Sequence, residues 1–511
     1  MKRDRTSMLY GTLLLTGTGI VSQFLGFVYR ILLSRLIGAE IMGLYQLVMP
    51  VYSVLLSLTA VGLTSAVSNL SSQYHARGRR AAAAQVLRRC LLLFFLLFAA
   101  VAGAVALLSD PISVYLLGDA RTRLGLLLLL PCLLLTGVEN LHKHFFYGAG
   151  CVRPPALVEL CEQFIRTGAV LGLLVLFLPQ NPERTVGLIV LGMTICEVFS
   201  AAALFLLVRR HLLQSGEPGG PREEGRRLTR RIASITVPIG LTSLLGNLMG
   251  AATSVLIPQR LVQAGAQVSQ AMEAFGVLCG MTLPMLSLPT AFIGALGLVL
   301  VPKLAEGVAL GRRELVQQLV DRSLLATSAL ILPAMALLAA LGPWVGAVLF
   351  NEPTVGRYIL PLSVGVALSC CQSVLSAALN GVGRPGAAAR NAILCGVVQL
   401  GCTFFLMGLP GVGLAGYVAG CVASAALGVL LNWLEIRRVT GLRARMFQWC
   451  IAPALSALLA GLVARLLFRV LLDAGMGVLS GAGVCLLFGG VLYLAALQAQ
   501  GLHLGRLFRL G

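Results

Sequence analysis

Residues 91–108 read LLLFFLLFAAVAGAVALL and contain no charged side chain. As an α-helix, such a run crosses most of the roughly 30 Å hydrocarbon core of a bilayer. Lipid offers no partners for backbone N–H and C=O groups, so a spanning segment must pair them internally, as a helix does. Similar apolar runs recur along the whole chain, and the alternation typical of barrel strands is absent. This stretch therefore predicts one membrane-spanning helix among many.

The composition agrees with that prediction. Hydrophobic residues make up 58% of the 511 residues and charged residues only 11%, with a mean hydropathy of +0.91. A soluble protein would carry about 25% charged residues. We therefore expect an all-α polytopic membrane protein of about fourteen spans. The expected spans are 8–36, 41–70, 86–109, 122–147, 155–179, 185–208, 232–258, 272–302, 319–342, 357–381, 387–409, 412–435, 448–471 and 475–499.

The first apolar run, from about Met8 to Ile37, follows a basic N-terminus and could be mistaken for a signal peptide. It is too long for the apolar region of a signal peptide and lacks a convincing cleavage site. We interpret it as a retained span.

The formal net charge of +20 would suggest nucleic acid as a partner of a soluble protein. Here the basic residues gather in alternate loops, for example around Arg77–Arg80, 209–231 and Arg312–Arg313. That asymmetry follows the positive-inside rule, in which basic loops stay in the cytoplasm. It predicts a multi-pass protein of the cell membrane with both termini cytoplasmic and an even number of spans. Contact with anionic membrane lipids is a secondary role for these residues, and no nucleic-acid partner is expected.

An internal repeat is expected on either side of the polar loop 209–231. The segment from Gly43 to Arg80 is similar to that from Gly276 to Arg313, about 233 positions later. A second pair of matching segments is Gly148–Gly150 and Gly381–Gly383. We expect an N-terminal lobe at 1–231, a C-terminal lobe at 232–442 and two additional helices at 443–511. Transporters built from such parallel repeats place the substrate between their lobes and alternate access to it.

The thirteen cysteines lie singly inside apolar segments or as the neighbours Cys370 and Cys371, without a CxxC motif. This pattern predicts neither a disulfide framework nor a metal site. The chain also lacks a P-loop and any recognisable arrangement of catalytic side chains. We expect no cofactor and no enzymatic activity.

Several motifs resemble the stage V sporulation protein B family. They include Leu25-Gly26-Phe27-Val28-Tyr29-Arg30, Gly43-Leu44-Tyr45-Gln46, Glu162-Gln163-Phe164-Ile165-Arg166 and Leu256-Ile257-Pro258-Gln259-Arg260-Leu261. The family is part of the superfamily of polysaccharide exporters, MurJ-like lipid II flippases and multidrug extruders. The resemblance implies fourteen helices, two six-helix lobes around a cavity, and movement of an undecaprenyl-pyrophosphate-linked sugar to the outer leaflet. Relatives often carry an acidic residue in the seventh span, where this chain has Gly250–Ser254, and this departure weakens the expectation of ion coupling by the second lobe.

Charged residues inside the spans are candidate functional residues, because a charge in lipid normally faces a cavity or a partner. Arg166 lies near the middle of the fifth span, with Glu159 and Glu162 on the same helix face. Glu197 in the sixth span is as far from the intervening turn as Arg166, which predicts a pair at one depth. This network is expected either to handle pyrophosphate and respond to a cation or proton, or to be a neutral structural pair.

Three further basic residues are candidates for binding the substrate. Arg30 has no carboxylate one turn away and suits a diphosphate through its planar fork of donors; the alternative is a side chain that snorkels to the interface. Lys143 lies near the inner end of the fourth span and either receives a headgroup or snorkels. Arg260 lies at the outer end of the seventh span and is expected at a cavity rim or an interface.

The sequence thus favours a lipid-linked oligosaccharide flippase for lipid II or a related peptidoglycan precursor, a role in cell-wall biosynthesis or sporulation. One alternative is a cation-coupled multidrug extruder of the same superfamily. The other is a membrane-embedded enzyme of cell-wall assembly, for which no loop is long enough to hold the acidic or metal-binding residues.

Overall fold

The computed structural model describes residues 2–178, 181–214, 225–442 and 447–501. Within these ranges the regular elements are all helical. The chain divides into two compact units, Met1–Val255 and Leu256–Gly511, so the division falls within a helix that begins after the expected linker. Of the polar stretch Gln214–Pro221 in that linker, only Gln214 is among the described residues.

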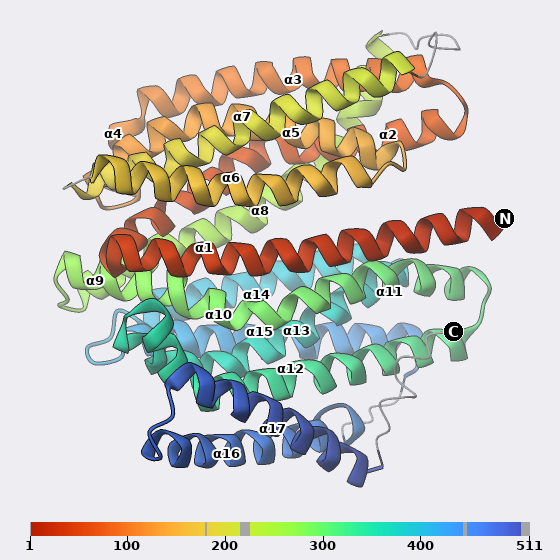
Figure 1. Ribbon diagram of the computed structural model, residues 1–511. Helices are drawn as coiled ribbons and strands as arrows, with labels where there is room; N and C mark the ends of the chain where they lie inside the picture. Colours follow the sequence, from red (N-terminus) through yellow and green to blue (C-terminus); the bar gives the residue numbers. More distant parts are fainter. Residues whose placement is uncertain (1, 179–180, 215–224, 443–446, 502–511) are drawn as a thin grey trace. The chain divides into compact units, whose positions relative to one another are not determined.

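The first unit contains eight α-helices interrupted by short π- and 3-10 segments. They are α1 (Lys2–Leu56), η1 (Ser57–Val61), α2 (Gly62–Ala76), α3 (Arg80–Leu107), α4 (Ser109–Pro111), η2 (Ile112–Leu116), η3 (Ala120–Thr122), α5 (Arg123–Gly148), α6 (Arg153–Phe177), α7 (Pro182–Gln214) and α8 (Gly225–Gln263), which continues into the second unit. Helices α3, α5, α6 and α7 run alongside one another (Figure 1).

The second unit contains the remaining helices. They are α9 (Val268–Phe275), η4 (Gly276–Thr282), α10 (Leu283–Ser287), η5 (Leu288–Thr290), α11 (Ala291–Ala309), α12 (Arg313–Phe350), η6 (Pro353–Tyr358), α13 (Ile359–Gly381), α14 (Pro385–Leu406), α15 (Leu414–Thr440), η7 (Phe447–Ile451), α16 (Ala452–Asp473) and α17 (Val478–Ala499). The irregular turns η4 and η5 fall around Pro284 and Pro289, because proline removes a helical hydrogen bond.

Thirteen helices in the described ranges are long and apolar enough to cross a bilayer. The first of them, Thr16–Ala76, has 61 residues; at 1.5 Å per residue it would be about 90 Å long, three times the apolar thickness of a membrane. Gly38 interrupts it with a non-helical backbone (φ 76°, ψ 174°). The kink separates two spans, which makes fourteen and confirms the predicted polytopic helical fold. The helices extend beyond the expected spans, and no gap separates the first two.

The internal repeat is visible in the backbone of the turns. Gly78 and Gly311, and likewise Gly150 and Gly383, are 233 positions apart and all adopt positive φ. A third pair with this spacing is Gly118 and Asn351, also at positive φ. The next residues, Asp119 and Glu352, both cap the helical turn that follows with a side-chain carboxylate. The predicted repeat is therefore present at equivalent turns of both units.

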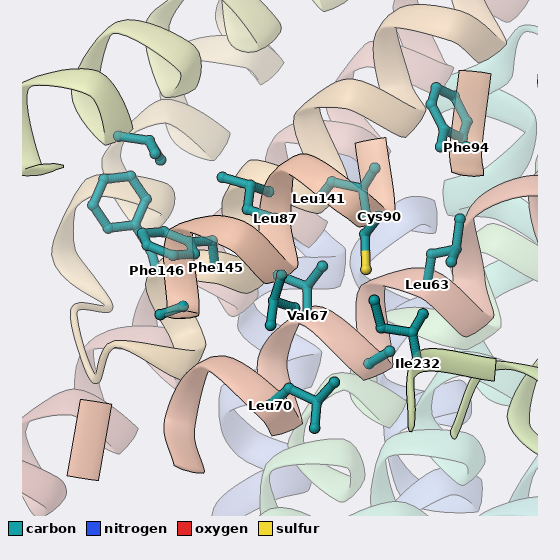
Figure 2. Packing of buried hydrophobic residues seen from close by; sticks show 14 of the residues in the cluster. Leu63, Val67, Leu70, Leu87, Cys90, Phe94, Leu141, Phe145, Phe146 and Ile232 are labelled. Carbon is teal, nitrogen blue, oxygen red and sulfur yellow. The ribbon is translucent and has the colours of Figure 1, made fainter. Parts of the chain in front are cut away.

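A cluster of buried apolar side chains joins helices α2, α3, α5, α7 and α8 in the first unit (Figure 2). Leu141 and Phe145 place one face of α5 in this cluster. Glu139 and Lys143 lie two positions before them, about 200° around the helix axis. Packing of the apolar face therefore directs these two charged residues away from the cluster and towards α6 and α7.

Candidate functional site

Six charged residues of the first unit form what we call the charged cluster. Helix α5 contributes Glu139 and Lys143, α6 contributes Glu159, Glu162 and Arg166, and α7 contributes Glu197. Spacings of three and four residues place the members from one helix on one face. All six lie within the spanning helices, so their placement needs mutual compensation.

Arg166 connects two helices at the centre of the cluster. Its guanidinium is paired with Glu162 one turn earlier and lies 3.6 Å from a carboxylate oxygen of Glu197. Its Nε also contacts the sulfur of Cys196 at 3.5 Å. Only 7% and 4% of the two glutamate side chains are exposed. The predicted pair between Arg166 and Glu197 is confirmed.

Lys143 connects α5 with α6 at a position nearer than Arg166 to the turn between Gly148 and Arg153. Its Nζ lies 3.2 Å from Glu159 and 3.6 Å from Glu139. The side chain is mostly buried, so Lys143 does not snorkel out of the unit in this structure. Glu139 was not among the predicted site residues, although its position one turn before Lys143 was a signal for such a partner.

An apolar layer covers one side of the charged cluster. It contains Tyr29, Tyr45, Cys132, Val170 and Met193. Along α5, α6 and α7 these residues lie beyond the charged residues, on the side away from the Arg77–Arg80 turn. Glu159, on the opposite side, is the most exposed carboxylate of the cluster, with 35% of its side chain accessible. The most accessible side of the charged cluster is therefore at Glu159.

The charge balance of the cluster decides what it can bind. Four carboxylates face two cations, and both cations are already paired, which leaves two formal negative charges. Glu162, Cys196 and Glu197 bring possible ligand atoms within 4.8 Å of one another, but the guanidinium of Arg166 occupies the same place. This arrangement is suited to protons and cations rather than to an additional anion.

Arg30 differs from the other predicted basic residues. It lies in α1, eight residues before the Gly38 kink, and is half-buried. Within the part of the chain that the structure describes, it has neither an ion pair nor a hydrogen bond. A guanidinium in a spanning helix is therefore available for an external anion.

Arg260 belongs to the second unit and is held locally. Its guanidinium lies 3.4 Å from the centre of the Phe404 ring and donates to Gln263 at 2.8 Å. These contacts leave donors of the guanidinium uncommitted, and the expected place of Arg260 at a cavity rim or an interface stays a prediction.

Comparison with known proteins places the chain in a family. The profile of the polysaccharide biosynthesis protein family matches residues 8–308, which is more than half of the sequence. The chain belongs to the polysaccharide biosynthesis protein family. The matched part contains the complete charged cluster and Arg30. Stage V sporulation protein B of Bacillus subtilis (strain 168) is 24% identical over 466 residues, covering 88% of this chain and 87% of that protein.

A second relative and two solved structures are also similar to this chain. The lipid II flippase MurJ of Bacillus subtilis (strain 168) is 24% identical over 466 residues, covering 85% of this chain and 84% of that protein. A structure of the lipid II flippase MurJ in an inward closed conformation has a TM-score of 0.71 at 13% identity and covers 97% of this chain and all of that one. An inward-facing MATE multidrug transporter of the MOP superfamily has a TM-score of 0.67 at 15% identity, covering 85% of this chain and all of that one. The family fold is thus that of polytopic transporters.

The second unit of this family member carries neutral side chains where the first is charged. Helices α5 and α13 end at Gly148 and Gly381, which are 233 positions apart, so Glu139 corresponds to Gln372. The main-chain carbonyl oxygen of Gln372 accepts a hydrogen bond from the side-chain amide of Asn432, whose side-chain oxygen accepts one from the buried amide of Asn391 at 2.9 Å. These buried amides were not predicted, because uncharged polar residues in a span give a weaker signal than charges.

Proposed function

We propose that this protein is a flippase for a lipid-linked oligosaccharide. Its substrate is an undecaprenyl-pyrophosphate-linked cell-wall precursor of the lipid II kind, moved from the inner to the outer leaflet by alternating access. Family membership supports a role in polysaccharide or peptidoglycan assembly. Similarity to stage V sporulation protein B and to the lipid II flippase MurJ supports this substrate class.

Arg30 is the observation that carries the proposal. An Arg without a partner in a spanning helix is costly, by several kcal/mol on insertion scales, unless an anion compensates it. The described residues provide none for Arg30. A pyrophosphate matches its planar fork of donors and leaves again when the headgroup is released. Lys143 and Arg166 are paired within the charged cluster, so in this conformation they are less available than Arg30 to bind a phosphate.

The proposed orientation has the N-terminus and the C-terminus in the cytoplasm. The basic turns Arg77–Arg80 and Arg312–Arg313 would then lie on the cytoplasmic side, as the positive-inside rule requires. There they also attract anionic lipid headgroups. The substrate would enter from the cytoplasmic leaflet, with its negatively charged pyrophosphate at the surface that carries these basic turns.

A cation-coupled multidrug extruder is the second candidate, and the charged cluster is the observation that favours it. Excess carboxylates suit a coupling ion and a cationic drug. The comparisons favour the flippase, because the MurJ structure covers 97% of this chain and the multidrug transporter 85%. Helices α16 and α17 follow the two predicted six-helix lobes, and a long polyprenyl tail could use them as a lipid-facing surface. Enzymatic chemistry is not part of the proposal.

Reconstitution of the purified protein into liposomes containing lipid II tests the function directly. Translocation is followed by the accessibility of the headgroup to a membrane-impermeant reagent, with protein-free liposomes and liposomes containing an unrelated membrane protein as controls. We expect lipid II to cross only with this protein. Export of a cationic dye without any movement of lipid II would establish the extruder instead.

A further inference from the structure

The carboxyl groups of Glu139 and Glu197 face each other between α5 and α7. Each glutamate side chain is only 4% exposed. The two carboxyl groups are within hydrogen-bonding reach of each other. One oxygen of Glu197 lies 3.6 Å from Arg166, and the other, Oε2, has no hydrogen-bond donor among the described residues. Two ionised carboxylates cannot donate to each other, so this contact becomes a hydrogen bond only when one of them holds a proton.

The charge of the surroundings leads to the same conclusion independently. The charged cluster has two more carboxylates than cations, inside a helical unit that spans lipid. Unpaired buried charges cost several kcal/mol each, and like charges at contact distance add to that cost. A single proton on the two carboxyl groups removes one excess charge and turns the contact between them into a hydrogen bond.

We propose that Glu139 and Glu197 share one proton and form a proton-binding carboxyl pair in the first unit. The shared proton follows from the geometry of these two side chains. Its use in transport, with uptake in one state of the cycle and release in the other, rests on the proposed function. The transported proton would be the coupling ion of the flippase, and Glu159 would be the exposed member through which water reaches the pair.

Several titratable groups surround this carboxyl pair. Lys143 on α5 lies beside Glu139, while Glu162 and Arg166 on α6 lie beside Glu197. The thiols of Cys132 on α5 and Cys196 on α7, and the phenol of Tyr52 on α1, are also close to Glu197. The two cations hold the pair at one negative charge, because each stabilises a carboxylate next to it. Loss of the shared proton or gain of a second one would unbalance this arrangement.

A proton fits this site better than a metal ion. Hard cations such as Mg²⁺ and Ca²⁺ require six or more oxygen ligands. The described neighbours of the pair offer few uncommitted oxygens, and Arg166 and Lys143 would repel a metal ion from the same position. The cysteine thiol of the group is a poor ligand for a hard cation.

Infrared spectroscopy of the purified protein without substrate tests the shared proton. We expect a carboxylic acid C=O band at neutral pH that shifts in D₂O and disappears at high pH. Both Glu139→Gln and Glu197→Gln should lose it, because the remaining carboxyl receives an amide N–H and ionises beside its cation. Glu435→Gln is the matched control and should retain the band, since Glu435 is held between Arg390 and Arg438 of the second unit.

The possible outcomes separate this inference from the proposed function. Absence of the band in the wild-type protein, its persistence in either variant, or its loss on adding sodium at constant pH would overturn the shared proton. The wild-type spectra decide the matter even if a variant fails to fold. In liposomes, a pH gradient should change the rate of lipid II movement by the wild type and not by Glu139→Gln. If lipid II does not move while the band behaves as expected, the flippase assignment fails and the carboxyl pair remains; if it moves but ignores the pH gradient, the coupling role fails.

Discussion

The guanidinium of Arg166 lies 3.6 Å from the carboxylate of Glu197, across the antiparallel helices α6 and α7. Both side chains are nearly the same number of residues from the turn around Asn181, which brings them to one depth. The same guanidinium is paired with Glu162. One cation thus holds two buried carboxylates from different helices.

Replacement of Arg166 by Ala should therefore strongly destabilise the protein. Removing one partner of a buried ion pair costs about 3–5 kcal/mol, because the remaining charges stay buried. We expect a large loss of membrane abundance and a lower thermal transition in detergent, with a smaller loss for Arg166→Lys. The double variant Arg166→Met with Glu162→Gln should recover part of the stability. Unchanged stability of Arg166→Ala would show that the ion pair is not structural.

A second ionic contact connects the two spans formed by α1 and α2 with the turn before α5. Arg121 is paired with Asp119 at 2.7 Å and with Glu40, two residues after the Gly38 kink, at 2.8 Å. We expect Arg121→Ala to lower the free energy of unfolding by about 1–3 kcal/mol, because charge-assisted hydrogen bonds are lost. Thermal unfolding of the wild type and of Arg121→Ala in detergent measures this loss of stability.

Arg123→Ala is the matched control for Arg121→Ala. Arg123 contacts Asp110 at 2.9 Å, but the two side chains are 50% and 62% exposed. Exposed pairs contribute about 0–1 kcal/mol. Equal destabilisation by the two substitutions would contradict the importance of the contact with Glu40.

The proposed membrane orientation gives a third prediction. In a cysteine-free variant, a cysteine introduced at Arg77 should react with an impermeant maleimide only after the membrane is permeabilised. One introduced at Thr354, beside the capping residue Glu352, should react in intact cells with the cell wall removed. The reverse pattern would invert the topology, and labelling of both positions from one side would contradict the number of spans.

The spans and the central ion pair could be predicted from the sequence for simple reasons. Apolar length identifies a span, and counting residues from a tight turn gives depth on two antiparallel helices. The rotation of a helix about its own axis is harder to predict, because a helix that is apolar all around has no polar face to orient it. The partnership of Glu139 with Lys143 and Glu197 depends on such a rotation of α5, which the apolar packing of Leu141 and Phe145 determines.

The repeat and the kink at Gly38 likewise contain features that the sequence predicts and features that it does not. The matching glycines predicted equivalent turns, and Gly78 and Gly311 adopt them, since positive φ is accessible mainly to glycine. Asn351 in place of glycine at the next equivalent turn could not be recognised from identity alone. No local signal distinguished a kinked continuous helix at Gly38 from two helices with a loop.

Arg30 gives the last prediction, which concerns transport rather than stability. Because Arg30 has no ionic partner in the described part of the chain, its replacement leaves no carboxylate unpaired. Arg30→Ala should reach normal membrane abundance and lose lipid II translocation, and Arg30→Lys should keep part of it, because Lys retains the charge without the planar fork. Arg123→Ala should translocate normally. A snorkelling residue would behave differently, since Lys reaches the interface as well as Arg does and Ala is cheaper in lipid. Full translocation by Arg30→Ala, measured per reconstituted protein, would exclude Arg30 as the pyrophosphate ligand.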